Sequence, residues 1–237
     1  MKNDYSRKLP AARSQETEFI KLTSKQWGVY YWLVSKSYWN GTKREGHYYL
    51  YKSSFNYADI KKDLKISDNR TIQKAIEKLE LYNKIAIAGD IIYIPHPDLY
   101  SYVSIKILSY LLNVCAITNL SNELIVLYSI LKRLKELNEK NGNKTTFTLK
   151  LFVKLLGHSE TDRKAYLLVR VFISFLSGEG LINISQATKR NRGGEYIEYT
   201  LWDIKRELDK ENIIDFNGEE VAEIQNKVKD LLEQEEN

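Results

Sequence analysis

The chain has little of what disulfides, metal sites and membrane spans require. It has one cysteine, Cys115, and three histidines that lie far apart, at His47, His96 and His158. A single cysteine excludes an internal disulfide and a cysteine-based zinc finger. No run approaches the roughly 18 apolar residues of a spanning helix, and the first nineteen residues lack the apolar stretch of a secretory signal. We therefore expect a folded cytoplasmic protein with no metal, no cofactor and no contact with a membrane.

The sequence also lacks the motifs of enzymes that act on nucleic acids. No GxxxxGK[ST] loop marks an ATPase, and no His-x-His pair is present to hold the metal of a strand-nicking enzyme, although tyrosine nucleophiles are plentiful. We expect His96, between two prolines, and His158, in a turn, to be structural or exposed. Cys115 lies in an apolar run and is expected to pack as a small hydrophobic residue. The sequence thus predicts a protein that is not an enzyme.

The charge of the chain is unevenly distributed. With 43% hydrophobic and 28% charged residues, the chain can fill one large core or two ordinary ones. The net charge is +5, but residues 218–237 hold seven acidic and two basic side chains, a net of −5, so residues 1–217 carry +10. A basic body suits a polyanion such as nucleic acid, although many basic proteins have no such partner.

Residues 19–97 show the pattern of a first domain, after a polar, aperiodic segment (1–18) that we expect to be a flexible arm. The expected elements are a helix from Thr23 to Asn40, a strand over 47–51, a helix over 57–65, a helix capped by Ser67 or Asp68, and a hairpin of 85–88 and 91–94. In the capped helix, Ile72, Ala75, Ile76 and Leu79 fall on one stripe. This order is that of a winged helix-turn-helix domain.

The pattern then repeats. After a linking helix within 98–120, residues 121–208 predict a helix over 122–140, a strand over 145–149, helices over 150–156 and 161–176, and strands 182–185 and 196–199 around a long basic loop. A shift of 93 residues places the stripe of the first domain on that of the second, and Arg70 on Arg163. The fold class is therefore α+β, predominantly helical, with two tandem winged helix-turn-helix domains. Residues 209–237 form an acidic tail with an amphipathic helix over 219–232.

The segments LKISDNRTIQKAIEKLELYNKI and LLGHSETDRKAYLLVRVFISFLSGEGLI resemble the recognition-helix halves of winged-helix DNA-binding proteins. The resemblance covers about residues 19–95 and 120–205. Two such units in a Lys-, Ile- and Asn-rich chain look like the replication initiators of low-GC bacterial plasmids and phages, including relatives that help to load the primosome. The resemblance implies binding to repeated sites in an origin, assembly as a dimer or higher homo-oligomer, and recruitment of helicase-loading proteins.

A winged helix places its third helix in the major groove and its wing on the backbone or minor groove. We therefore expect double-stranded DNA to contact the starts of both third helices and the tip of the second wing. The predicted DNA-binding residues are Asn69, Arg70, Gln73, Lys74, Arg163, Lys164, Arg170, Lys189, Arg190 and Arg192. The alternatives are a solvated helix face for the helix residues and a disordered polar loop for the wing.

Aromatic residues offer a second hypothesis. Tyr30, Tyr31, Trp32, Tyr38, Trp39, Tyr48, Tyr49 and Tyr51 could stack on single-stranded bases, but such residues more often fill a core, and we favour the core.

The sequence therefore predicts a sequence-specific double-stranded DNA-binding protein, a replication initiator of a plasmid or phage. A transcriptional repressor or partition regulator with the same fold is the nearest alternative, and a primosome-type protein-interaction module is the second. The tail is either a partner-binding or coiled-coil helix or a loose acidic appendage that competes with DNA.

Overall fold

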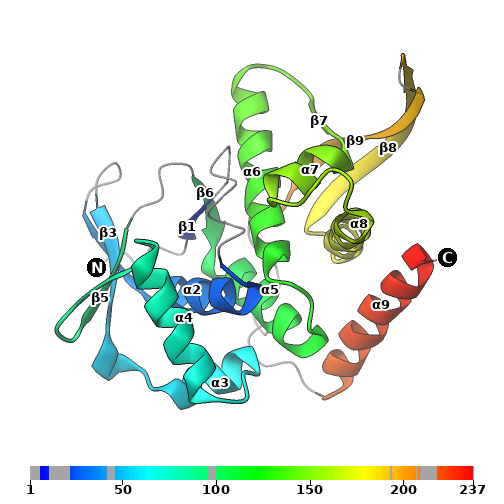
Figure 1. The fold of residues 1–237 in the computed structure, drawn as a ribbon. Helices are drawn as coiled ribbons and strands as arrows, with labels where there is room; N and C mark the ends of the chain where they lie inside the picture. The colour runs from blue at the N-terminus through cyan, green and yellow to red at the C-terminus, as the bar shows by residue number, and fades with distance from the viewer. Residues whose placement is uncertain are drawn as a thin grey trace.

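The computed structural model describes residues 6–10, 22–41, 46–95, 100–192, 194–206, 208 and 218–236. These residues form a mixed helical and stranded protein (Figure 1). The helices are α2 (Ser24–Lys36), α3 (Tyr57–Leu64), α4 (Asn69–Leu81), α5 (Ile105–Thr118), α6 (Glu123–Lys140), α7 (Leu149–Leu155), α8 (Arg163–Gly178) and α9 (Gly218–Glu236), with a 3-10 turn, η1 (Lys52–Ser54). The strands are β1 (Ser6–Pro10), β2 (Tyr38–Gly41), β3 (Gly46–Tyr51), β4 (Ala86–Ala88), β5 (Ile91–Pro95), β6 (Tyr100–Ser104), β7 (Thr145–Phe147), β8 (Ile182–Asn191) and β9 (Gly194–Ile204).

The first unit follows the predicted order with one correction. Helix α2 begins where expected, because the Thr23 hydroxyl accepts from the Gln26 N–H and the Gln26 side chain accepts from the Thr23 N–H at 2.8 Å. The helix ends at Lys36 instead of Asn40: Ser37 is extended, and β2 pairs with β3. The predicted hairpin of β4 and β5 is confirmed, and Gly89 takes the positive φ of +59° that its turn requires.

Strand pairing gives each unit a sheet with the same internal order. In the first sheet the order is β2-β3-β5-β4, and in the second it is β7-β9-β8. In both, the strand that precedes the two consecutive helices (α3 and α4, or α7 and α8) pairs with the last strand of the hairpin, and the first hairpin strand lies at the edge. Strand β2 is an addition to the first sheet.

The second hairpin is longer than predicted. We expected a polar loop between short strands, but β8 and β9 pair from Ile182 opposite Ile204 to Asn191 opposite Gly194, with one register shift between Asn183 and Ile184. All side chains in the outer part of β8, from Gln186 to Asn191, are exposed. Polar residues there are compatible with a strand, so polarity alone does not indicate a loop.

Two further boundaries are corrected. The expected flexible arm contains β1, which pairs antiparallel with β6 from Ser6 opposite Ser104 to Pro10 opposite Tyr100. The expected linking helix is α5, a central element whose residues Ile107, Leu111 and Val114 are fully buried. It packs against α2, α3, α6 and α9, so it is part of the core and not a linker. His96 and Pro97 lie outside the described residues.

The two units share one hydrophobic core. One cluster of buried side chains runs from Leu22 on the first unit, through α5, to Ile204 on the second. Polar contacts reinforce the junction: the Asn122 N–H donates to the Ser24 hydroxyl at 2.8 Å, and its side-chain amide donates to the Ser24 carbonyl at 3.0 Å. The relative position of the two units is therefore fixed by packing.

The acidic C-terminal helix α9 is docked on the body. Its residues Ile224 and Val228 are buried, and α9 packs against α8 and α5. The Gln225 side chain donates to the Ile117 carbonyl at 2.8 Å, and the Lys227 ammonium pairs with Glu179 at the end of α8. The described part of the tail is thus not a loose appendage. None of the described helices is both long and apolar enough to cross a bilayer.

Candidate nucleic-acid interface

Helix α4 presents the first group of predicted contacts to solvent. Asp68 caps the helix, accepting from the Thr71 hydroxyl at 2.8 Å and from the Thr71 N–H at 2.7 Å, and these hydrogen bonds hold the pKa of Asp68 below its usual value. Ile72, Ala75 and Leu79 are buried on the opposite side, and α4 packs against α2. This packing leaves the predicted contacts Asn69, Arg70, Gln73 and Lys74 exposed.

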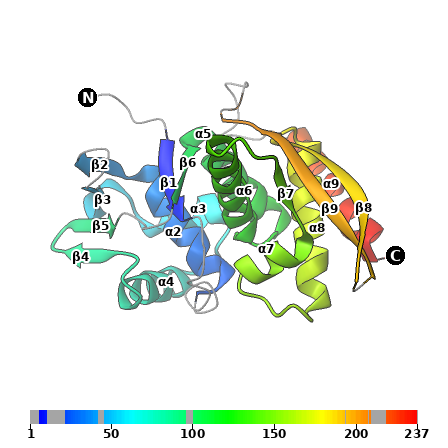
Figure 2. The same ribbon diagram turned by 90° about the horizontal axis from the view of Figure 1, so that it is seen from above.

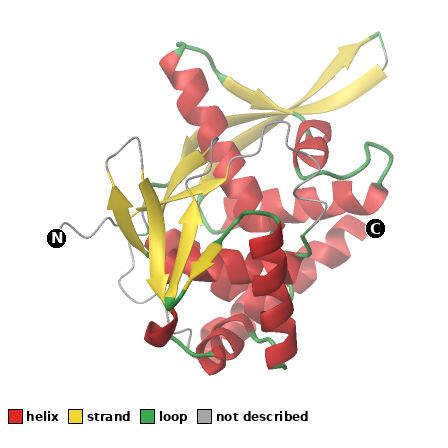
Figure 3. Cartoon of the chain, turned by 60° about the vertical axis from the view of Figure 1, so that its left-hand side comes forward, coloured by secondary structure: helices red, strands yellow, loops and turns green. Residues whose placement is uncertain are grey.

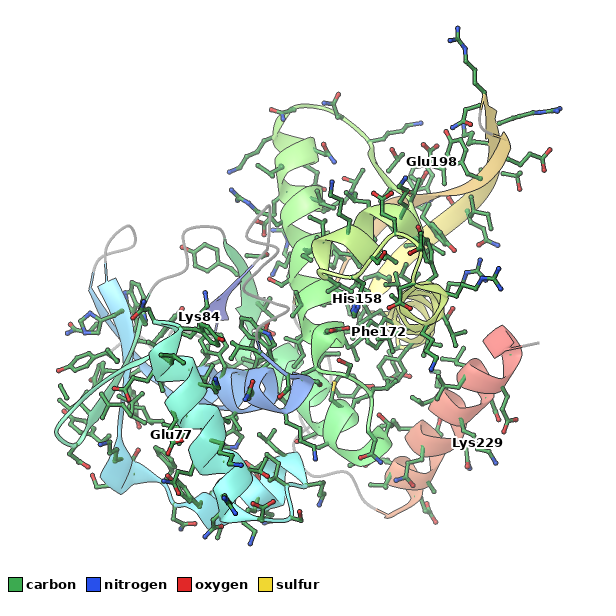
Figure 4. The ribbon with its side chains drawn as sticks, viewed as in Figure 1. Glu77, Lys84, His158, Phe172, Glu198 and Lys229 are labelled. Carbon is green, nitrogen blue, oxygen red and sulfur yellow. The ribbon has the colours of Figure 1, made fainter. Side chains whose placement is uncertain are left out.

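The exposed side of α4 is polar and mixed in charge. Glu77 lies on it, as Figure 4 shows, and the Gln73 side-chain amide donates to the Glu77 carboxylate at 3.1 Å. This contact holds Gln73 along the helix. Arg70 and Lys74 are therefore the stronger candidates for phosphate contact, and Gln73 must leave Glu77 to reach a base edge.

Helix α8 is built in the same way in the second unit. Asp162 caps it by accepting from the Lys164 N–H at 3.0 Å and the Ala165 N–H at 3.2 Å. Ala165, Val169 and Phe172 are buried toward the core. The predicted contacts Arg163, Lys164 and Arg170 are all exposed.

The start of α8 is anchored by contacts that the sequence did not reveal. The His158 ring, in the turn before the helix, lies 3.1 Å from the Glu123 carboxylate at the start of α6. Lys150 on α7 pairs with Glu160 in the same turn at 2.7 Å, and this pair raises the pKa of Lys150 and lowers that of Glu160. Both contacts join residues too far apart in sequence for periodicity to indicate them.

The ribbon of β8 and β9 carries the third group of predicted contacts, Lys189, Arg190 and Arg192, at its outer end. Long side chains that end in nitrogen project there (Figure 4). Two acidic residues on β9 partly offset this positive charge. The Lys189 ammonium lies 3.8 Å from the Glu198 carboxylate, and Arg190 is opposite Glu195 in the strand register.

The two helices and the ribbon reach a common side of the molecule. Helix α4 lies in front of α2 in Figure 1, and Figure 2, which views the molecule from above, shows α4 and the N-terminal end of α8 at the same lower edge. The ribbon end projects past α8 on that side. In Figure 1, α8 lies between the ribbon and α9, and α9 meets the C-terminal end of α8, where Lys227 pairs with Glu179.

Burial perturbs one thiol and several tyrosine hydroxyls away from these surfaces. Cys115 is buried, and this burial raises the pKa of its thiol well above the usual value. Burial likewise raises the pKa values of Tyr30, Tyr31 and Tyr128. Within the described ranges, no group of three or more His, Cys, Asp or Glu residues is arranged to hold a metal ion.

The aromatic residues divide into two sets. Tyr30, Tyr31, Trp32 and Tyr48 are buried, so the core interpretation is confirmed for them, and Trp39 is half-buried against Tyr48. Tyr38 and Tyr51 are 58% and 45% exposed, and Tyr49 is half-buried. These three share the outer face of the first sheet, where the core interpretation is wrong.

Comparisons of the chain with protein-family models, with curated proteins and with solved structures found no match.

Proposed function

We propose that the chain is a sequence-specific double-stranded DNA-binding protein built from two winged-helix units. The observation that carries this proposal is the repeated topology. In each unit a helix, a strand, two closely spaced helices and a hairpin follow one another, with β2 added in the first unit. The strand that directly precedes the two helices pairs with the last strand of the hairpin. That is the arrangement in which a winged helix presents its third helix to the major groove.

The exposed residues fit this use. Arg70 on α4 and Arg163 on α8 occupy equivalent positions, because each lies two residues before the first buried residue of its helix, and both are exposed. Guanidinium groups donate to phosphate and to the acceptors of guanine in the major groove. Cations near the ribbon end suit a phosphate backbone or a narrow minor groove. Affinity would come from phosphate contacts, and specificity from the two helices.

Within this class, we propose a role in initiating the replication of a plasmid or phage, exercised in the cytoplasm. This role is supported by the sequence resemblance to tandem winged-helix initiators and not by a structural feature. Selection of bound duplexes from a source-genome pool tests it. Clustered repeats beside AT-rich DNA are expected, whereas one palindrome over a promoter would favour the repressor.

Fluorescence anisotropy with selected duplexes, over a series of salt concentrations, tests DNA binding itself. Phosphate neutralisation predicts a steep fall in affinity as salt rises. Arg163→Ala is expected to weaken binding without unfolding the chain, while Lys106→Ala, an exposed cation on α5, serves as the matched control. No binding to any duplex at low salt, or an affinity that does not respond to salt, would overturn the proposal.

A further inference from the structure

The outer face of the first sheet is an aromatic surface, which we call the tyrosine platform: Tyr38, His47, Tyr49, Tyr51 and Tyr93. Side chains alternate along β3 and β5, so Tyr48, Leu50, Ile92 and Ile94 point inward and are buried. Figure 3 brings this side of the molecule forward and shows the strands with no helix over them. The large rings therefore lie on a face that the described part of the chain does not pack against.

The strand register arranges these rings as a cross centred on Tyr49. Tyr49 is opposite Tyr38 on one neighbouring strand and opposite Tyr93 on the other, which gives one row across three strands. His47 and Tyr51 flank Tyr49 along β3. The ring centroids of Tyr38 and Tyr49 are 5.8 Å apart with a tilt of 37°, and those of His47 and Tyr93 are 5.1 Å apart. The planes of His47 and Tyr93 meet at 68°, and those of Tyr49 and Tyr51 at 87°, so these rings contact each other edge to face. Tyr38 and Tyr51 are the most exposed rings, and they are therefore the ones open to a stacked base.

We infer that the tyrosine platform binds the unpaired bases of single-stranded nucleic acid. Bases stack on aromatic rings whatever their sequence, and tyrosine hydroxyls can also hydrogen-bond to base edges. This inference does not depend on the duplex-binding proposal, because it rests on a different face of the protein.

Charge favours a nucleic acid over other occupants. The strands β2, β3, β4 and β5 contain no Asp, Glu, Lys or Arg, so no carboxylate on them repels phosphate. Charged residues of both signs lie at the margin of the sheet. Lys52 follows β3 and donates to the Gly89 carbonyl at 2.8 Å, Lys84 precedes β4, and Asp90, in the turn between β4 and β5, accepts from the Ser53 hydroxyl at 2.7 Å. Residues 1–217 carry +10.

The chemistry of the platform also argues against a protein partner. The leucine and isoleucines of β3 and β5 are concentrated on the inner face, where Leu50, Ile92 and Ile94 are buried, and only Ile91 is partly exposed on the outer face. Interfaces between proteins are enriched in methionine and arginine as well as aromatic residues, and these strands have neither.

The platform and the duplex interface can be occupied together. The platform faces the left of Figure 1, whereas α4 packs its buried side on α2 and turns its exposed side to the viewer. A strand separated from a bound duplex could therefore reach the platform without displacing that duplex from α4.

The test uses the full chain and a fluorescein-labelled oligothymidine, read by anisotropy at fixed salt. Tyr38→Leu and Tyr49→Leu keep apolar bulk but remove the aromatic face, and each is expected to weaken binding by about fivefold or more. Tyr38→Phe and Tyr49→Phe keep the ring and are expected to retain most of the affinity. Tyr102→Leu, which replaces a tyrosine of β6 that is 37% exposed, is the matched control and is expected to bind as the parent does.

The outcomes separate this inference from the duplex proposal. Circular dichroism and urea unfolding first establish that each variant is folded. Leucine variants that bind oligothymidine as tightly as the parent overturn the platform, whatever happens with duplexes. If those variants instead lose a parent dimer in sedimentation, the face is a self-association surface and the inference is wrong. Arg163→Ala is expected to lower affinity for duplex DNA and to leave oligothymidine binding unchanged.

Discussion

The ribbon end offers the most quantitative test of the duplex interface. Lys189, Arg190 and Arg192 are exposed at the end of β8 and β9, but Lys189 already lies 3.8 Å from Glu198. We therefore expect Arg190 and Arg192 to make phosphate contacts and Lys189 to remain with its carboxylate. Replacing all three residues with glutamine removes three charges and, on this reasoning, two contacts with DNA.

The magnitude follows from counterion release. Each phosphate contact contributes about 0.9 to the slope of log affinity against log salt, so the triple variant should have a slope smaller by about 1.8. Over a fourfold rise in salt, the fold-loss of affinity should therefore be about 12 times smaller for the variant than for the parent. The assay is anisotropy with one selected duplex at several salt concentrations.

A matched variant controls for the change in net charge. Replacing Lys106, Lys140 and Lys144 with glutamine also removes three exposed charges, but these residues lie outside the proposed interface. The control should keep the parent slope. Equal slopes for the parent and the ribbon variant would refute the placement of the ribbon on DNA, and equal reductions in both triple variants would show that net charge alone attracts the duplex.

Three further predictions concern the folded core, each measured by urea unfolding. Val228→Ala should lower the free energy of unfolding by about 2 kcal/mol, because Val228 is 2% exposed where α9 docks; an unchanged value would mean that α9 does not stay docked. Gly28→Ala should lower the free energy of unfolding by about 1–3 kcal/mol, since the added Cβ would lie 2.8 Å from the Asn122 side-chain nitrogen. A variant as stable as the parent would show that Asn122 can move away without cost. Burial lowers the pKa of Lys132, against an opposing effect of Glu136, so the unfolded state binds the proton more tightly. The free energy of unfolding should therefore rise as pH increases from the lowered pKa of Lys132 in the folded chain toward the usual lysine pKa of 10.5. Lys132→Met should remove this alkaline rise, and a rise that persists in the variant would assign it to another group.

Local patterns in the sequence predicted most elements because their signals are short-range. The capped starts of α2 and α4, and the Gly89 turn, depend on residues within four positions of one another. The exposed stripes of α4 and α8 follow from the same periodicity, so the predicted contacts on these helices are all on the surface. The elements that carry the candidate interface were therefore accessible to sequence reasoning.

Elements whose surroundings are set by distant residues were predicted less well. The aromatic run through Trp39 suits a helix or a strand equally, and its pairing with Tyr48 on β3 decides between them. Helix α5 was assigned to a linker by its position between two units, although its nearly uniform apolar character is typical of a buried helix. The tyrosine platform was missed because the alternation that buries Tyr48 exposes Tyr49, and only the register shows which face the core covers.

The central position of α5 changes how two reading helices would act on one DNA molecule. Domains joined by a flexible linker contribute almost independently and tolerate variable spacing between their half-sites. Here α5 contacts α2 and α3 on one unit and α6 on the other, and Asn122 is hydrogen-bonded to Ser24 across the junction. Rotating one unit against the other would open this shared core, at a cost in buried apolar surface. On the proposed function, a duplex that met both α4 and α8 would have to present its two half-sites at one spacing, so the two helices would read a single composite site instead of two additive ones.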